Sequence, residues 1–396
     1  MQLVTNGRVT DSTRHIPALD GLRAIAILLV IPHNVYVFET IRGWLAPFAW
    51  IASFGWVGVQ LFFVLSGFLI TRNLLDSRGA PNYYSAFFGR RILRIFPLYF
   101  LVLSFFLLVL PRFAALSADI RASYANQVWL WLFLSNWAQP FGKEVYWFSH
   151  FWSLAVEEQF YFVWPLVVAT VSRRLAPVCV AIIIAALAIR VGMVEAGAKP
   201  EMLYMFTVCR MDALACGALA AVLAGSPRFM SGVREHADWL LGITLIILAL
   251  GSAYTHSYAA FDTPTLTVGQ TLLSLCATAV LLLIVAGSRG GITRFLEFVL
   301  SLAPLRSVGK VSYAMYIFHL PIATGIIAPL LLPRLKQLGP GFPVWYALVN
   351  ILCSYLVALA SWHLLEKHFL RAKRFFVAAK GARIAPATVG SFPPEA

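Results

Sequence analysis

Residues 19–34 read LDGLRAIAILLVIPHN, and the interpretation of the rest of the chain depends on this stretch. An apolar run begins directly after Arg23 and contains His33, so we expect the histidine to lie within a membrane-spanning helix. An ionisable side chain at that depth is costly unless a polar group meets it, and an intramembrane histidine is therefore a candidate functional residue. Other motifs matter according to whether they can reach His33.

The composition indicates a polytopic membrane protein. Of the 396 residues, 60% are hydrophobic and 12% are charged, whereas soluble domains have about half apolar and about a quarter charged residues. The excess of apolar side chains must face lipid. The formal net charge of +14 at pH 7 is expected to reflect membrane topology, because Lys and Arg gather in cytoplasmic loops. Nucleic-acid binding is not expected, since no basic helix or aromatic RNA-binding surface accompanies the charge.

Apolar runs long enough to cross about 30 Å of hydrocarbon predict an all-α bundle of about ten transmembrane helices. They are expected near residues 22–38, 51–71, 93–111, 152–172, 175–194, 203–224, 238–256, 265–286, 308–332 and 342–365. With a cytoplasmic N-terminus, about twenty-two of the Lys and Arg residues fall on the cytoplasmic side, as the positive-inside rule requires. Both termini are therefore expected in the cytoplasm.

The chain is expected to form one integral membrane domain over residues 1–370. Residues 371–396 are basic and then rich in Pro and Gly, which predicts a cytoplasmic tail attracted to anionic lipid. We expect no cleaved signal peptide, because residues 1–18 lack the expected cleavage site. The 5 cysteines lack CxxC spacing, so neither disulfides nor a metal site is expected.

The spacing of Arg23 and His33 is the main geometric question in the first helix. On an ideal helix, residues eleven apart differ by about 20° and residues ten apart by about 80°. Arg23 therefore shares its face with Asn34, and His33 is rotated away. Pro32 disrupts the preceding turn, and tightening of that turn toward a 3₁₀ helix would return His33 to the Arg23 face. The alternative is a histidine that only satisfies a neighbouring helix.

Two adjacent carboxylates lie in HFWSLAVEEQFYFVWPL, residues 150–166. Glu157 and Glu158 need polar partners inside a membrane, and His33 and Arg210 are the candidates. A carboxylate beside a histidine orients the imidazole and stabilises its protonated form, as a general base requires. The alternative is a structural ion pair with Arg210.

Three arginines precede a proline in FFGRRILRIFPLYF, residues 87–100. Arg90 and Arg94 are four residues apart and share one face of the helix, with Arg91 beside them. Such a cluster suits a phosphate or pyrophosphate, because guanidinium groups form bidentate hydrogen bonds. The alternative is ordinary positive-inside charge.

Other polar residues interrupt the remaining apolar runs. Residues 58–72 (GVQLFFVLSGFLITR) contain small residues that permit close helix packing, and packing is favoured over catalysis there. Gln60 is expected to bond across the bundle. Arg190, Arg210 and Asp212 are expected to hold the outer part of the bundle through ion pairs. A last polar stripe, which either lines a cavity or serves only packing, consists of Tyr313, Tyr316 and His319.

Six of these segments resemble the successive signatures of acyltransferase family 3, which comprises integral membrane acyltransferases. The segments are, in order, LDGLRAIAILLV, GVQLFFVLSGFLI, RRILRIFP, FWSLAVEEQFYFVWPL, RMDALACGALAA and VSYAMYIFHLPI. The resemblance covers residues 15–370 and implies transfer of an acyl group, most often acetyl, from cytoplasmic acyl-CoA. The acceptor implied is a hydroxyl of an extracytoplasmic or lipid-linked glycan.

The resemblance also implies roles for individual residues. The first-helix motif of the family pairs an arginine with a histidine after ten intervening residues, and both are regarded as essential. Arg23 matches the motif, but nine residues separate it from His33, and Asn34 holds the expected position. The cytoplasmic arginines belong to the core of the family pattern, consistent with a phosphate-rich donor.

We therefore predict a multi-pass O-acyltransferase of the inner membrane. His33, with Arg23, would take the proton of the acceptor hydroxyl or transiently carry the acyl group. Glu157 or Glu158 would orient or charge-balance the histidine, and the arginines would hold the phosphates of CoA. The expected partners are acyl-CoA, a glycan acceptor and membrane lipid, without a metal.

Two alternatives remain open. One is a transporter or flippase for a charged or glycan substrate, since intramembrane ionisable residues also mark substrate paths. The missing inverted repeat argues against it. The other is a non-catalytic partner in a surface-polysaccharide complex, which the displaced histidine suggests.

Overall fold

The computed structural model describes residues 16–34, 43–112, 118–255, 258–287 and 290–379, which form helices joined by turns and loops, without β-strands. The longer helices are α1 (Pro17–His33), α3 (Val57–Asp76), α4 (Tyr83–Ser104), α8 (Phe151–Val171), α9 (Leu175–Glu195), α11 (Thr207–Ala224), α13 (Ala237–Tyr254), α14 (Gln270–Ala286), α17 (Ser312–Ile322) and α20 (Phe342–Ser361). The shorter ones are α2 (Ala46–Ser53), α5 (Ala118–Ala125), α6 (Gln127–Trp131), α7 (Ser135–Ala138), α10 (Pro200–Met205), α12 (Pro227–Glu235), α15 (Gly291–Leu300), α16 (Ala303–Lys310), α18 (Ala328–Leu330), α19 (Leu332–Lys336) and α21 (Lys367–Arg371).

Nine helical segments in the described ranges are long and apolar enough to cross a membrane. They are Ala46–Asp76, Tyr83–Arg112, Phe151–Val171, Leu175–Glu195, Pro200–Ala224, Ala237–Tyr254, Thr265–Ala286, Ser312–Leu330 and Phe342–Phe376. Each coincides with one of the predicted spans, so the all-α bundle is confirmed, with nine such segments against the ten predicted. The side on which the termini lie stays a prediction, and residues 1–15 and 380–396 lie outside the described ranges.

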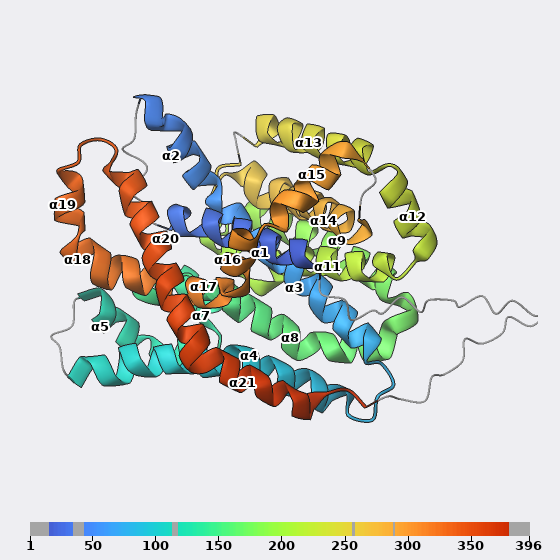
Figure 1. Ribbon diagram of the computed structural model, residues 1–396, viewed down its shortest axis with the longest axis horizontal. Helices are drawn as coiled ribbons and strands as arrows, with labels where there is room; N and C mark the ends of the chain where they lie inside the picture. Colours follow the sequence, from blue (N-terminus) through green and yellow to red (C-terminus); the bar gives the residue numbers. More distant parts are fainter. Residues whose placement is uncertain (1–15, 35–42, 113–117, 256–257, 288–289, 380–396) are drawn as a thin grey trace, which may run out of the picture.

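The tenth predicted span, 22–38, corresponds to α1. This helix has 17 residues, or about 26 Å at ~1.5 Å per residue, slightly less than the hydrocarbon thickness. Positions 35–38 lie outside the described residues. α1 nevertheless lies in the middle of the bundle, where it packs against α3, α15, α16 and α17 (Figure 1). It is therefore a central helix of the bundle.

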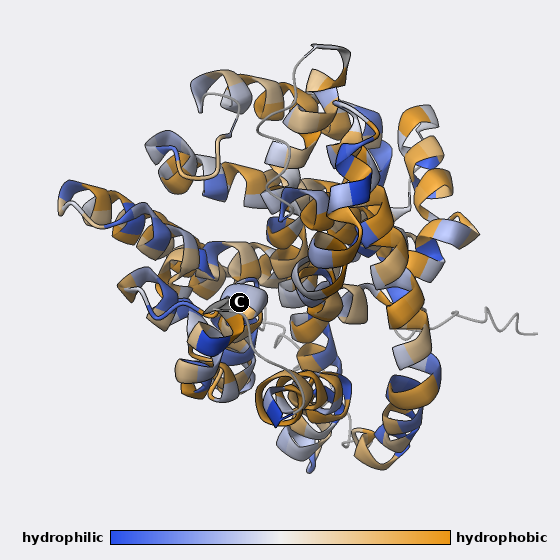
Figure 2. Cartoon of the chain, turned by 90° about the vertical axis from the view of Figure 1, so that its left-hand side faces the viewer, coloured by the Kyte–Doolittle hydropathy of each residue, from blue (hydrophilic) through white to orange (hydrophobic). Residues whose placement is uncertain are grey.

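The outer surface is suited to lipid. Large apolar side chains are strongly exposed, including Phe162 (77%), Trp239 (79%) and Leu364 (79%). Apolar residues run along most of the helices in Figure 2. Soluble monomers rarely expose apolar surface on this scale. The structure is thus that of a multi-pass membrane protein.

Two close helix crossings fix the position of α1. A Cβ atom at Gly21 would lie 1.9 Å from the carbonyl oxygen of Leu300, and one at Gly309 would lie 1.8 Å from that of Asp20. Only glycine permits backbones to approach so closely. The crossings bring Arg23 to the wall that α16 and α17 build, where its Nη1 lies 3.5 Å from Oδ1 of Asp20.

A polar network holds together the helices on the far side of α3. The predicted ion pair is confirmed for Arg190 and Asp212, which are 2.8 Å apart and fully buried. Arg210 is different: its Nη2 donates to Oε1 of Gln60 at 2.5 Å, and its guanidinium lies 5.3 Å from the ring centre of Tyr204. The expected bonding of Gln60 across the bundle is therefore confirmed, whereas the proposed pairing of Arg210 with the carboxylates of α8 is wrong.

Candidate functional site

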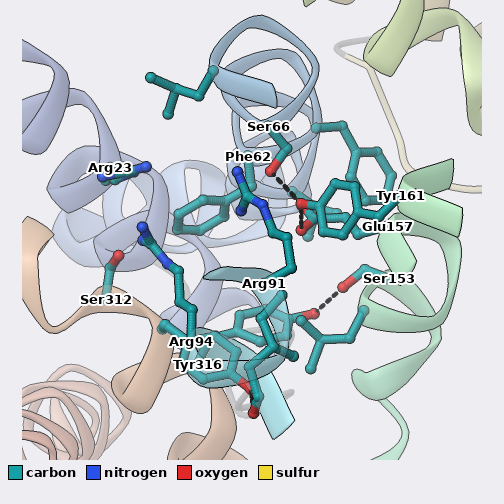
Figure 3. Close-up of a pocket in the computed structure, with 16 residues that line it drawn as sticks. Arg23, Phe62, Ser66, Arg91, Arg94, Ser153, Glu157, Tyr161, Ser312 and Tyr316 are labelled. Atoms are coloured by element: carbon teal, nitrogen blue, oxygen red, sulfur yellow. Dashed lines mark hydrogen bonds between the residues drawn. The ribbon is translucent and has the colours of Figure 1, made fainter. Parts of the chain in front are cut away.

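A central cavity of about 90 Å³ lies between α1, α3, α4, α8 and α17. Its polar lining residues are Arg23, Ser66, Arg91, Arg94, Ser153, Glu157, Tyr161, Ser312, Tyr313 and Tyr316. In Figure 3, the guanidinium groups of Arg23, Arg91 and Arg94 are directed toward the same space. The cavity thus brings together three cations from two helices that are distant in the sequence.

Glu157 is the carboxylate of this cavity. The Tyr161 hydroxyl donates to its Oε2 at 2.5 Å, and the Ser66 hydroxyl donates to its Oε1 at 3.0 Å. Glu157 and Tyr161 meet because residues four apart are neighbours on a helix. Arg91 lies over the Tyr161 ring, 5.1 Å from its centre. Glu158 is rotated by about 100° on α8 and does not line the cavity.

Two further pockets adjoin the arginines. The basic pocket, about 290 Å³ in volume, is lined by Arg23, Leu69, Asn73, Phe87, Arg90, Arg91, Arg94 and Lys373. The mixed pocket, about 660 Å³, is lined by Asp20, Arg23, Arg94, Ala303, Arg306, Ser307, Lys310, Tyr313, Trp362, Glu366 and Leu370. Arg23 and Arg94 line both pockets and the central cavity. An anion that enters either pocket therefore meets these two guanidinium groups.

The three predicted arginines of α4 have different surroundings. Arg91 and Arg94 reach the central cavity, whereas Arg90 lines only the basic pocket. Arg90 donates from Nη1 to the carbonyl oxygen of Phe376 at 2.9 Å and from Nη2 to Oδ1 of Asn73 at 2.7 Å. Arg90 therefore also holds the C-terminal segment against α4.

His33 lies at the opposite end of α1 from Arg23, about 15 Å away along the axis at ~1.5 Å per residue. The predicted 3₁₀ tightening at Pro32 is wrong: α1 stays α-helical through His33, and the Asn34 amide donates to the carbonyl of Val30 at 3.1 Å. His33 accordingly stays rotated away from the Arg23 face, and it does not line the central cavity.

A backbone carbonyl orients the His33 ring. Nδ1 lies 3.1 Å from the carbonyl oxygen of Ala52. Because a carbonyl only accepts, this contact assigns the proton to Nδ1 and leaves the lone pair on Nε2. We expected a carboxylate in this orienting role, but Glu157 bonds instead to Ser66 and Tyr161.

Asn34 contacts a second histidine. Its Nδ2 lies 3.0 Å from Nε2 of His319, whose Nδ1 lies 2.7 Å from the carbonyl oxygen of Tyr316. His319 is fully buried, and its ring centre lies 4.5 Å from that of His150. The two contacts assign the Nδ1–H form to His319, with Nε2 accepting from Asn34.

The predicted polar stripe divides between two environments. Tyr313 and Tyr316 line the central cavity, whereas His319 does not. The Tyr316 hydroxyl lies 2.6 Å from that of Ser153 and donates to the carbonyl of His150 at 2.7 Å. Tyr316 therefore lies between the cavity and His150. We use the name histidine layer for His33, His150 and His319 together with Asn34.

Sequence reasoning did not assign three residues that the structure brings to the site. Ser66 is one of the small residues in 58–72, where packing is favoured, but its hydroxyl donates to Glu157. Tyr161 was not singled out, and its spacing of four from Glu157 was the available signal. Lys373 falls in the predicted tail, residues 371–396, and nothing in the local pattern indicates that it returns to α4.

A family model described as "Acyltransferase domain" matches residues 16–359. The chain belongs to acyltransferase family 3. This member of the family is 30% identical to the "Putative peptidoglycan O-acetyltransferase YrhL" of Bacillus subtilis, in a match that covers 90% of the chain and 55% of that relative. It is 27% identical to the "Peptidoglycan O-acetyltransferase OatA" of Listeria monocytogenes, over 90% of the chain and 56% of the relative.

A third relative is the "O-acetyltransferase OatA" of Staphylococcus aureus, which is 26% identical over 90% of the chain and 57% of its own length. The acyltransferase family 3 chain thus spans about half the length of the curated relatives that it matches. No solved structure matches it significantly.

Proposed function

We propose that the protein is a membrane O-acetyltransferase that moves an acetyl group from acetyl-CoA to a hydroxyl of a cell-envelope glycan such as peptidoglycan. The observation that carries this proposal is the central cavity, where Arg23, Arg91 and Arg94 face one hydrogen-bonded carboxylate, Glu157. The O-acetyltransferase names of the relatives support the reaction, and two of those names specify peptidoglycan.

The donor binds through its phosphates at the arginines. Three guanidinium groups against one carboxylate leave the cavity with an excess of positive charge. Guanidinium groups bind phosphate through paired hydrogen bonds, and they do so more strongly away from bulk water. The clustering of Lys and Arg in the predicted inner loops supports a cytoplasmic position for the end of the cavity where the arginines lie. It also supports cytoplasmic termini and a location in the cytoplasmic membrane.

The acyl group is transferred at the histidine layer. In CoA, the pantetheine arm separates the phosphates from the thioester, so phosphates at Arg23 are compatible with a thioester about 15 Å further along α1. The arm passes the hydroxyls of Ser66, Tyr161 and Tyr316 on the cavity wall. Glu157 balances the charge of the arginines that it faces, which keeps them directed into the cavity.

His33 acts as the general base. Its Nε2 lone pair removes the proton from the acceptor hydroxyl, whose oxygen attacks the carbonyl carbon of the thioester. The new C–O bond forms as the C–S bond breaks, and the imidazolium returns the proton to the departing CoA thiolate. The Ala52 carbonyl holds Nδ1–H and thereby keeps Nε2 as the basic nitrogen.

The test uses purified protein in liposomes with acetyl-CoA and peptidoglycan fragments. We expect release of free CoA thiol only when acceptor is present, together with a gain of mass equal to one acetyl group on the glycan. Cells that lack the gene are expected to lose the same mass increment from a surface glycan. Solute flux that is independent of acetyl-CoA, with no thiol release, would identify a transporter instead.

A further inference from the structure

The basic pocket is lined by cationic side chains, with no carboxylate among the described residues that line it. Its ionisable lining residues, as far as the structure describes the chain, are Arg23, Arg90, Arg91, Arg94 and Lys373. Like charges in one pocket repel each other, and a polyanionic ligand removes this repulsion. The volume of about 290 Å³ is close to the lower end of the range for small-molecule sites, roughly 300–1,000 Å³. The pocket is therefore suited to a phosphate-bearing group.

The mixed pocket differs in its charge. Asp20 and Glu366 line it together with its basic residues, and the ammonium group of Lys310 lies 4.7 Å from the ring centre of Trp362. Lys310 thus already has an aromatic partner, and the acidic residues offset the remaining charge. Of the two pockets, the basic one attracts a polyanion more strongly.

The wall of the basic pocket that contains Lys373 is built by the segment 372–379, which follows α21. Asn82 donates from Nδ2 to the carbonyl of Val377 at 2.9 Å, and its Oδ1 accepts from the amide of Ala379 at 2.8 Å. The Phe376 ring lies against Gly89, where a Cβ atom would come within 2.0 Å of it. With the bond from Arg90 to Phe376, these contacts fix the segment against α4.

Lys373 lines this pocket, in the part of the chain that the structure describes. Within the described residues, no hydrogen bond or ion pair of its ammonium group occurs, and it is partly buried. It shares the pocket with Arg23, Arg90, Arg91 and Arg94, all of like charge. A partly buried cation in such surroundings gains from an anion that all five groups can share.

We propose that Lys373 binds a phosphate of the acyl donor and that the C-terminal segment 372–379 is part of the donor site. This inference rests on the proposed function, since it assigns a further residue to the same donor. It places the diphosphate of CoA in the basic pocket, between α4 and the C-terminal segment, with the pantetheine arm leading past Arg23 and Arg94 into the central cavity.

The test measures binding of CoA by calorimetry to full-length protein in lipid nanodiscs. We expect Lys373→Gln to weaken binding by about tenfold or more, as for loss of a charged hydrogen bond, and Lys373→Arg to recover most of that loss. The matched control is Arg374→Gln, which removes the same charge from an exposed neighbour outside the pocket. High salt should reduce the difference between the wild type and Lys373→Gln, because screening weakens charge pairing.

Each result has a separate meaning. Unchanged affinity in Lys373→Gln, or a larger loss in Lys310→Gln, overturns the placement in the basic pocket while the proposed function stands. Failure of the wild type to bind CoA overturns the donor in the proposed function itself.

A second measurement does not depend on a variant that folds. Amine-reactive acetylation of the wild type, followed by mass spectrometry, should slow at Lys373 when CoA is added and stay constant at the exposed Lys336. Equal labelling of Lys373 with and without saturating CoA contradicts the proposal.

Discussion

Replacement of His33 by alanine gives the sharpest test of the transfer step. Nδ1 of the ring lies 3.1 Å from the carbonyl oxygen of Ala52, and the ring is partly exposed. Loss of one hydrogen bond costs about 0.5–1.5 kcal/mol of stability. Loss of a general base lowers the rate by about 10²–10⁴-fold, which corresponds to roughly 3–5 kcal/mol of activation free energy. The expected loss of activity therefore clearly exceeds the loss of stability.

The matched control is Asn34→Ala, at the adjacent position and of similar size. Asn34 donates to Nε2 of His319 at 3.0 Å, and its removal leaves a buried ring nitrogen without a donor, at a cost of about 1–3 kcal/mol in stability. The assay is acetyl-CoA-dependent thiol release in liposomes, with thermal unfolding measured on the same preparations. We expect a hundredfold or greater loss, as estimated above for a general base, in His33→Ala and a loss below about tenfold in Asn34→Ala.

The outcome that refutes this reasoning is the reverse order. Full activity in His33→Ala, with a large loss in Asn34→Ala and His319→Ala, would show that His319 is the base. Asn34, which holds the histidine position of the family motif, would then act by orienting His319. Equal losses of activity and of thermal stability in both variants would show that the layer serves only packing.

Three further predictions concern the cavity and the helices that form it. Glu157→Gln should lower acetyl transfer by at least about tenfold, whereas Glu158→Gln, one residue further on and outside the cavity, should leave it within about twofold; the opposite order contradicts the assignment. Asp212→Ala should destabilise the protein by about 3–5 kcal/mol, because it leaves Arg190 as a buried unpaired charge; a melting temperature equal to that of the wild type would show that the pair carries no such weight. Gly309→Ala should cost about 1–3 kcal/mol by overpacking and raise the KM for acetyl-CoA, since it displaces α1; an unchanged KM would show that the crossing does not set the position of Arg23.

The spans could be predicted from sequence because they depend on a local property. Each of the nine membrane-capable segments is an apolar run whose length the bilayer sets, so composition alone locates it. The short amphipathic helices α12, α15 and α16 were not predicted, because they fall between apolar runs and depend on contacts with other helices. α16 is the most consequential of them, since its Gly309 holds α1 in place.

The site could be predicted in its residue types but not in its pairings. Arg23, Arg91, Arg94 and Glu157 stand out as ionisable residues in apolar surroundings, and the structure brings them to one cavity. The spacing along one helix gives the face of a residue but not its partner on another helix. For this reason the sequence alone does not predict the hydrogen bond between Arg90 and the C-terminal segment.

The shortened spacing in α1 has a physical consequence at the histidine layer. A shift of one residue turns a side chain by about 100° on a helix, which moves the imidazole of His33 toward the carbonyl of Ala52. The position that the family motif gives to histidine is held by Asn34, which bonds to His319. An imidazole therefore still lies next to the family position, supplied by α17.

The two imidazoles differ in the use of Nε2. Both have Nδ1 within hydrogen-bonding distance of a backbone carbonyl, that of Ala52 for His33 and that of Tyr316 for His319. In His319 the Nε2 lone pair already accepts from Asn34, whereas the described residues contain no hydrogen-bond donor to Nε2 of His33. A general base needs a free lone pair directed at the hydroxyl. His319 would have to break its bond to Asn34 before it could act as the proposed base, whereas His33 would not. We therefore propose His33 for this role even though its spacing departs from the family motif.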